Sequence, residues 1–251
     1  MLDGTVALVT GASSGIGEAT ALLLAEEGAA VALAARRTDR LAGLAEKIRD
    51  GGGTALVIEA DVSDEAQARA AVARTVDELG RLDTLVNNAG VMLLGPIADA
   101  PVEEWQRMVH VNLLGLLYCA QAALPHLVSA AGTSPRRVAD MINVSSVAGR
   151  VARSGSGVYN ATKFGVGAFS ESLRQEITRR HLRVSLVEPG AVATELTEHL
   201  RPEIRQQVAP MFANTEPLQA EDIAETITFI VTRPRRMAIN EVLVRPTEQE
   251  R

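Results

Sequence analysis

Short apolar runs alternate with longer stretches of helical period from the start of the chain to its end. The run from Val6 to Val9 is apolar at every position rather than at every second one. Continuous apolar strands are typical of a parallel sheet that helices cover on both faces. The pattern predicts strands over Val6–Thr10, Ala30–Ala35, Thr54–Ala60, Thr84–Asn87, Asp140–Val144, Arg183–Glu188 and Glu241–Arg245.

Helices are predicted between these strands, over Gly15–Glu27, Thr38–Asp50, Asp64–Leu79, Val102–Val128, Val158–Arg180 and Ala220–Val231. Asp64 has the character of a helix N-terminal residue, and Gly28 and Gly80 fall where helices should stop. Repeated βα-type units in one register predict an α/β fold with a single doubly wound parallel sheet of about seven strands. We therefore expect residues 1–251 to form one domain, with helices on both faces of the sheet.

Two stretches interrupt the alternation. Ser129–Arg137 is polar, contains Gly and Pro, and is predicted as a loop before a strand. Thr194–Pro217 is longer, helix-prone and rich in proline, and it follows the C-terminal end of a strand. Ligands of doubly wound sheets bind at those ends, so this second stretch is interpreted either as a substrate lid or as an ordinary variable excursion.

Composition and charge exclude several classes of protein. With 47% hydrophobic residues, 22% charged residues and a net charge of −6, the chain is typical of soluble globular proteins and gives no support for nucleic-acid binding. The single Cys119 excludes an intramolecular disulfide, and the four histidines lack metal-ligand spacing, so we expect no metal. The apolar stretch Leu113–Leu127 is broken by polar residues and predicts a buried helix. Because no signal peptide is expected, we predict a cytoplasmic location.

A glycine-rich turn follows the first strand. Thr10–Gly17 reads TGASSGIG and opens the first helix. Glycines there let the backbone turn tightly and approach a pyrophosphate, which the free N–H groups of the helix N-terminus then bind. The spacing is GxxxGxG rather than the commoner GxGxxG. Expected cofactor-binding residues in this turn are Gly11, Ser13, Ser14, Gly15, Ile16 and Gly17.

The second strand ends in Arg36 and Arg37, and no acid appears until Asp39. An NAD site usually places an acid there for the ribose 2′-OH, whereas an arginine accommodates the 2′-phosphate of NADP. Guanidinium–phosphate contacts are charge-assisted and each contributes about 1.5–3 kcal/mol. The two arginines therefore favour NADP(H), with Ser13 as a further phosphate ligand. The plainer interpretation is a solvated doublet at a helix start.

Tyr159 and Lys163 lie four residues apart in a chain that has only two tyrosines and two lysines. In a helix this spacing places both side chains on one face. There the lysine ammonium is expected to lower the phenol pKa, so that the phenol can exchange a proton with a substrate oxygen. The alternative is a surface lysine beside a half-buried tyrosine.

These motifs taken together resemble the short-chain dehydrogenase/reductase family. The resemblance covers essentially the whole chain and rests on Thr10–Gly17, Asn87 to Gly90, Asn112, Ser146, Tyr159, Lys163, Pro189 and Gly190. It implies a homo-oligomeric enzyme with a Rossmann-type domain that moves a hydride between NAD(P)(H) and an alcohol/carbonyl pair. Within the family, the segments Gly4–Thr10, Val91–Pro96, Asn112–Gly115 and Val242–Thr247 resemble an NADP-dependent carbonyl reductase subgroup that includes clavulanic acid (clavaldehyde) dehydrogenase.

The resemblance also implies a catalytic tetrad of Asn112, Ser146, Tyr159 and Lys163. Ser146, rather than the adjacent Ser145, is chosen because the family places its serine thirteen positions before the tyrosine. Tyr159 would be the acid or base, and Ser146 would donate a hydrogen bond to the substrate oxygen. Lys163 would also hold the nicotinamide ribose, and Asn112 would hold a water that links Lys163 to solvent.

Further binding residues follow from the same resemblance. The expected cofactor contacts outside the glycine-rich turn and the arginine pair are Asp61, Val62, Asn88, Ala89, Gly90, Tyr159, Lys163, Pro189, Gly190, Val192 and Thr194. The residues expected to face the substrate are Met92, Leu93, Leu94, Ser146, Val147, Ala148, Arg153, Tyr159 and Ala191. A mostly apolar wall with an arginine suits a medium-sized hydrophobic or amphiphilic carbonyl compound, including one that bears a carboxylate. Each of these wall residues is equally explained by packing.

Two further questions concern catalysis and assembly. A non-catalytic NADP-binding regulator on the same fold is the main alternative, but such proteins typically lose the tyrosine or the lysine.

The helices predicted at Val102–Val128 and Val158–Arg180 carry more apolar residues than one sheet face can cover. In the resembling family these helices pair with a second copy, so we expect a homo-oligomer, with a tetramer favoured over a dimer.

Overall fold

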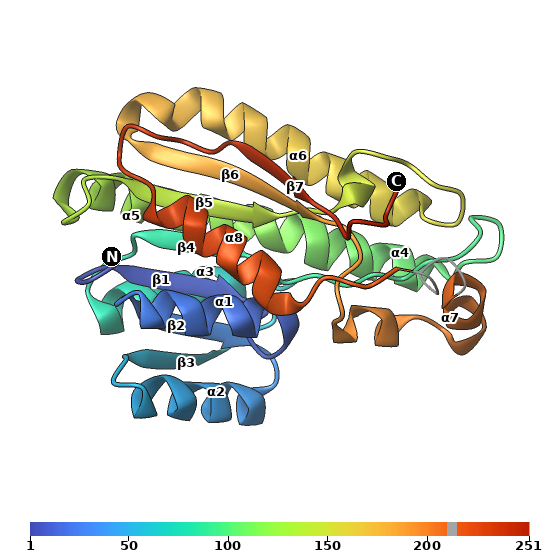
Figure 1. Ribbon diagram of the computed structural model, residues 1–251, viewed down its shortest axis with the longest axis horizontal. Coiled ribbons are helices and arrows are strands. Elements are labelled where there is room, and N and C mark those ends of the chain that lie inside the picture. Colours follow the sequence, from blue (N-terminus) through green and yellow to red (C-terminus); the bar gives the residue numbers. More distant parts are fainter. Residues whose placement is uncertain (210–214, 251) are drawn as a thin grey trace.

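The computed structural model describes residues 1–209 and 215–250, and these contain a seven-stranded parallel sheet in the order β3-β2-β1-β4-β5-β6-β7 (Figure 1). The strands are β1 Val6–Thr10, β2 Ala30–Ala35, β3 Ala55–Glu59, β4 Thr84–Asn87, β5 Ala139–Val144, β6 Leu182–Pro189 and β7 Glu241–Val244. The predicted fold class is confirmed. Strand order reverses between β1 and β4, and in doubly wound sheets a crevice for ligands opens at that point.

The helices connect successive strands. They are α1 Gly15–Glu26, α2 Thr38–Asp50, α3 Glu65–Leu79, α4 Val102–Met108, the π-helix η1 Val109–Leu114, α5 Gly115–Thr133, the 3₁₀ turn η2 Val147–Gly149, α6 Gly157–Ile177, η3 Thr178–Arg180, η4 Glu195–His199, α7 Pro202–Val208 and α8 Ala220–Thr232. Asp64 caps α3 by accepting a hydrogen bond from the Gln67 N–H at 2.9 Å. Gly80 ends that helix in the left-handed conformation, with φ of +83°. Both boundaries were predicted from the sequence.

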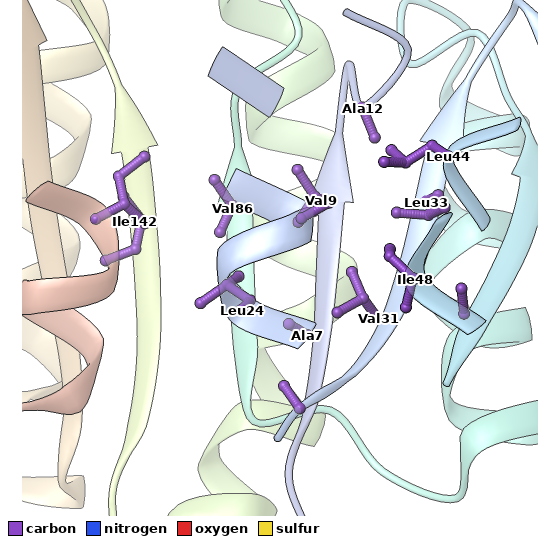
Figure 2. Packing of buried hydrophobic residues seen from close by; sticks show 14 of the residues in the cluster. Ala7, Val9, Ala12, Leu24, Val31, Leu33, Leu44, Ile48, Val86 and Ile142 are labelled. Atoms are coloured by element: carbon purple, nitrogen blue, oxygen red, sulfur yellow. The ribbon is translucent and has the colours of Figure 1, made fainter. Parts of the chain in front are cut away.

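Helices cover both faces of the sheet (Figure 1). The helices α1, α2 and α8 lie over one face, and α3, α5 and α6 lie over the other. On the first face, Leu24 of α1 and Leu44 of α2 pack towards Val9 and Leu33 of the strands (Figure 2). Leu8, the neighbour of Val9, packs into the core on the opposite face. Because both faces are buried, the strands must be apolar at successive positions.

The loop predicted over Ser129–Arg137 is wrong in its first half. α5 continues to Thr133, because Ala130 and Ala131 are buried against the core and extend its apolar face. The rest of the segment is a turn whose Arg136 pairs with Asp140 at 3.1 Å. Asp140 is fully buried and also pairs with the buried Arg183 at 2.7 Å. Arg136 of this segment therefore helps to neutralise a buried carboxylate instead of being solvated.

The stretch from α4 through α5 forms a long apolar helix over Val102–Thr133. By length and composition alone it could cross a membrane, but core helices also meet this criterion. Cys119, Ala123 and Leu127 of α5 are buried in the core beneath the sheet. The helix thus packs along one side as a core helix does.

Candidate active site

Two adjoining cavities lie at the carboxyl ends of the central strands. The first, about 310 Å³, runs along the ends of β1, β2, β4 and β6 and is called the cofactor cleft below. The second, about 630 Å³, lies beside it and is called the substrate cavity. The residues that line both cavities are Ser146, Tyr159, Gly190, Val192 and Leu196. A group bound in one cavity can therefore approach a group bound in the other at Ser146 and Tyr159.

The predicted cofactor residues, apart from Gly17, all line the cofactor cleft: Gly11, Ser13, Ser14, Gly15, Ile16, Arg36, Arg37, Asp61, Val62, Asn88, Ala89, Gly90, Tyr159, Lys163, Pro189, Gly190, Val192 and Thr194. Gly11 has φ of +66°, and a Cβ there would lie 2.8 Å from the Cα of Ala89. Gly17 lies behind the turn, where a Cβ would strike the Gly11 carbonyl. Both glycines are thus required by the turn's close packing.

Hydrogen bonds tie the glycine-rich turn to the segment after β4. The Thr10 hydroxyl accepts from the backbone N–H groups of Asn88 at 3.0 Å and Ala89 at 3.2 Å. In return, the Asn88 side chain donates to the carbonyls of Thr10 at 3.1 Å and Gly11 at 3.2 Å. The two sides of the cleft are therefore held together across the point where strand order reverses.

The predicted arginine pair borders the cofactor cleft where β2 ends, and its two members have different contacts. Arg37 donates through Nε to the Ser13 hydroxyl at 3.2 Å and through Nη2 to the Ser14 hydroxyl at 2.8 Å. Arg36 lies 3.8 Å from the Asp61 carboxylate. The structure thus brings Arg37 and both serines of the glycine-rich turn into one polar cluster.

Tyr159 and Lys163 occupy successive turns of α6 and are each 6% exposed. The Lys163 Nζ lies 5.9 Å from the centre of the Tyr159 ring and donates to the Val144 carbonyl at 2.9 Å. Ser146 is the N-cap residue of η2, and its hydroxyl accepts a hydrogen bond from the Ala148 N–H at 3.1 Å. The neighbouring Ser145 instead donates to the Lys163 carbonyl at 3.1 Å. The two adjacent serines thus make separate contacts, and Ser146 lines both cavities.

The expected direction of the Tyr159 pKa shift is wrong for this structure. Burial raises the pKa of Tyr159 to about 12, and hydrogen bonding with Ser146 only partly opposes that rise. Burial also lowers the pKa of Lys163 to about 8. The lysine ammonium, which donates to the Val144 carbonyl and lies 5.9 Å from the centre of the ring, does not outweigh this desolvation. Tyr159 is therefore protonated at neutral pH, which is the form a proton donor needs.

Both polar atoms of the Asn112 side-chain amide are hydrogen-bonded to Val91. Asn112 is buried within η1, and its side-chain oxygen accepts from the Val91 N–H at 2.8 Å. Its side-chain nitrogen donates to the Val91 carbonyl, also at 2.8 Å, and Asn112 lines neither cavity. The side-chain amide therefore anchors Val91, and the expected role of Asn112 in holding a water beside Lys163 stays a prediction. The wide π-helical turn around Asn112 is a feature often found near functional sites.

The residues expected to face the substrate line the substrate cavity, except for Leu93: Met92, Leu94, Ser146, Val147, Ala148, Arg153, Tyr159 and Ala191. Leu93 is buried with Val91 and Met108. Side chains of an extended segment alternate in direction, so Met92 and Leu94 face the cavity and Leu93 points away.

Two residues that the sequence interpretation missed also line the substrate cavity. The Asn160 side chain donates to the carbonyls of Ala148 at 2.7 Å and Val151 at 3.0 Å, which fixes the loop after η2. Its position directly after Tyr159 was the available signal. Gln249 accepts from the Ala191 N–H at 2.8 Å, and no local pattern indicates this contact.

The segment predicted as lid or excursion borders both cavities. η4 contributes Leu196, and α7 contributes Ile204 to the wall of the substrate cavity. Arg201, just before α7, pairs with Glu104 of α4 at 3.0 Å. Residues 210–214 of the predicted 194–217 segment lie outside the described residues. The rest forms a wall of the cavity that is anchored to α4.

A doubly wound sheet with a cleft at its strand ends and a buried cluster of Tyr159, Lys163 and Ser146 is the arrangement expected of a Rossmann-type oxidoreductase. The family model for short chain dehydrogenases matches residues 5–205, and the chain belongs to the short-chain dehydrogenase/reductase family. An uncharacterized oxidoreductase of Staphylococcus saprophyticus is 36% identical over 247 residues, which cover 97% of this chain and 96% of that protein.

Solved structures show the same similarity. The closed form of serine dehydrogenase complexed with NADP⁺ has a TM-score of 0.88 and 32% identity, over 98% of this chain and 97% of that one. A 3-ketoacyl-(acyl-carrier-protein) reductase from Brucella melitensis complexed with NADH has a TM-score of 0.85 and 30% identity, over 98% of each chain. Both kinds of nicotinamide cofactor thus occur among similar structures.

Proposed function

We propose that this oxidoreductase is NADP(H)-dependent and reduces a medium-sized aldehyde or ketone, as carbonyl reductases of the subgroup with clavaldehyde dehydrogenase do. The observation that carries the proposal is the position of Tyr159 beside Ser146, where the cofactor cleft meets the substrate cavity. The whole chain, 1–251, would serve as one cofactor-binding and catalytic domain in the cytoplasm.

The cofactor cleft fits a dinucleotide. Gly11 and Gly15 have positive φ, so the turn before α1 approaches its neighbours more closely than a side chain would allow. The N-terminus of α1 presents backbone N–H groups of the kind that bind a pyrophosphate. Arg37, Ser13 and Ser14 are the donors that would hold a 2′-phosphate. When bound, NADPH would supply the hydride.

The protein's own groups would handle the proton and the developing charge. Tyr159 would give its phenolic proton to the carbonyl oxygen as that oxygen becomes an alkoxide. Ser146 would donate a hydrogen bond to the same oxygen and stabilise its developing charge. The charged form of Lys163 would stabilise the tyrosinate left after proton transfer and hold the nicotinamide ribose. Asn112 would act by fixing Val91 and the π-helical turn.

The lining of the substrate cavity indicates the class of substrate. Its wall is largely apolar, from Met92, Leu94 and Ile204 among others. Arg153 and Arg205 are the charged residues among its described lining, which contains no acidic residue. These features suit an amphiphilic carbonyl compound that carries a carboxylate. A screen of NADPH oxidation against neutral and carboxylate-bearing aldehydes, ketones and quinones, with NADH as control, tests this proposal.

Cofactor preference is the first expected outcome. The contacts of Arg37 with Ser13 and Ser14 predict a kcat/KM at least about tenfold higher with NADPH than with NADH, given charge-assisted bonds of about 1.5–3 kcal/mol. Replacing Arg36 and Arg37 together, with Asp at position 37, should narrow or invert this ratio. An Arg49→Gln variant on the far end of α2 should leave it unchanged. Equal efficiency of the two cofactors in the unmodified enzyme would refute the NADP proposal.

Assembly into a homo-oligomer, with a tetramer favoured over a dimer, remains a proposal. Leu116 and Val166, which are apolar residues of the two helices on which the assembly prediction rests, are already buried within the chain. Phe164 of α6 stays 44% exposed, and Phe229 of α8 is 50% exposed. Exposed apolar side chains on two separate helices would suit two different subunit interfaces, as a tetramer requires. Sedimentation equilibrium at micromolar concentration should show multiples of the 26.6 kDa chain mass, and a single 26.6 kDa species would contradict the proposal.

A further inference from the structure

A carboxylate from a distant part of the chain is hydrogen-bonded to arginines at the end of the cofactor cleft where the 2′-phosphate is proposed to bind. Glu195 is the first residue of η4, in the segment that follows β6. Its carboxylate accepts from Arg37 Nη1 at 2.8 Å and from Arg40 Nη1 at 2.5 Å. Glu195 also lines the cofactor cleft, and Arg40 extends the basic cluster by one turn of α2. One acidic side chain therefore bridges two of the cationic groups at this end.

The bridged Arg37 is also the guanidinium that donates to Ser13 and Ser14. A 2′-phosphate bound by Arg37 and these serines would therefore lie within a few ångströms of the Glu195 carboxylate. Hydrogen bonds from Arg40 and Arg37 hold the pKa of Glu195 at about 2, so this carboxylate is ionised at neutral pH. A phosphate and a carboxylate would share the same donors and repel each other.

A ribose with a free 2′-hydroxyl would not be repelled by this carboxylate, because the hydroxyl can donate a hydrogen bond to it. NAD sites commonly hold that hydroxyl with an acidic residue at the end of the second strand, where this chain has Arg36 and Arg37 instead. Glu195 supplies an acceptor in the same region, but from the segment after β6. The chain thus combines phosphate-binding arginines with an acid of the kind that an NAD site requires.

We propose that Glu195 is a cofactor-specificity residue whose carboxylate competes with the 2′-phosphate of NADP(H) for Arg37 and moderates the preference for NADP(H) over NAD(H). The proposal rests on the proposed use of a nicotinamide cofactor in this cleft. It assigns the bridge between η4 and α2 a role in cofactor selection. Binding of NADP(H) would then require Glu195 to leave Arg37, with Arg40 as its remaining partner.

Binding of 2′,5′-ADP and 5′-AMP, measured by calorimetry at low salt, tests the proposal without any substrate. Glu195→Gln removes the charge and keeps the shape, so 2′,5′-ADP should bind about five- to tenfold more tightly. Binding of 5′-AMP, which has no 2′-phosphate, should not tighten. The gain in 2′,5′-ADP affinity from Glu195→Gln should shrink at about 0.5 M salt, because the Debye length falls to about 4 Å and repulsion between these exposed charges is partly screened.

Glu198→Gln is the matched control, because Glu198 is exposed on the same η4 turn and changes the net charge equally. It should leave both affinities within about twofold of the wild type. Equal gains from Glu195→Gln and Glu198→Gln would overturn the proposal, as would equal gains for the two ligands or no gain for 2′,5′-ADP. Thermal unfolding of each variant confirms that the fold is retained.

The outcomes for Glu195 and for the proposed function are separable. If the wild type binds 2′,5′-ADP tightly and Glu195→Gln changes nothing, the inference fails and the NADP proposal stands. If Glu195→Gln tightens 2′,5′-ADP binding but no carbonyl compound is reduced with either cofactor, the inference stands and the proposed reaction fails. If neither protein binds 2′,5′-ADP, both the inference and NADP dependence fail.

Discussion

Tyr159→Phe is expected to lower kcat for carbonyl reduction by about 10²–10⁴-fold, which is the usual contribution of a positioned general acid. The substitution removes one hydroxyl from a buried ring, so the packing with Val91 and Met108 is retained. The dissociation constant of NADPH should stay within about threefold, because the phenol is a minor part of the cofactor cleft. Stopped-flow reduction and fluorescence titration with NADPH measure the two quantities separately.

Tyr118→Phe provides a matched control, because Tyr118 is the other tyrosine of the chain and packs on α5, away from both cavities. It should leave kcat unchanged. Near-normal turnover in Tyr159→Phe would show that water or another residue donates the proton. A large loss in both variants would point to damaged packing instead, and their unfolding midpoints would then fall together.

The fold was predictable because its signals are local. The continuous apolar runs of β1 and β2 give their strands with the observed bounds, and Asp64 and Gly80 mark the ends of α3. The error at Ser129–Arg137 has a tertiary cause. Ala130 and Ala131 gain their burial from the neighbouring sheet, and Arg136 finds a carboxylate partner on β5. A polar composition does not reveal either contact.

The candidate site was predictable where one motif carries several neighbouring residues. The turn before α1 and the Tyr159–Lys163 spacing belong to this kind, because a turn or a helix fixes the geometry locally. The Tyr159 pKa was mispredicted because desolvation depends on how deeply the whole fold buries the phenol. Gln249 and the contact of Glu195 with Arg37 were missed because each joins segments that are distant in sequence.

Lys163→Arg is expected to lower kcat by at least about 10²-fold, although it conserves the positive charge. The Lys163 side chain is 6% exposed, and its ammonium fits between the Val144 carbonyl and the Tyr159 ring. A guanidinium is planar, carries five N–H donors and cannot occupy that compact position. Unlike Tyr159→Phe, this variant should also weaken NADPH binding, because Lys163 is proposed to hold the nicotinamide ribose. Titration with NADPH and single-turnover kinetics distinguish the two variants.

The pH dependence gives the lysine a signature that a purely structural role would lack. Burial lowers the pKa of Lys163 to about 8, so its ammonium is present below that pH and is lost as the pH rises through it. Carbonyl reduction by the wild type should therefore fall above about pH 8, well before Tyr159, with a pKa of about 12, loses its proton. The residual activity of Lys163→Arg should lack this decline, because an arginine stays charged. Lys47→Arg, at the only other lysine and exposed on α2, should retain both the rate and the decline. A wild-type rate that stays constant to pH 10, or a Lys163→Arg variant with normal kcat, would refute the proposed electrostatic role.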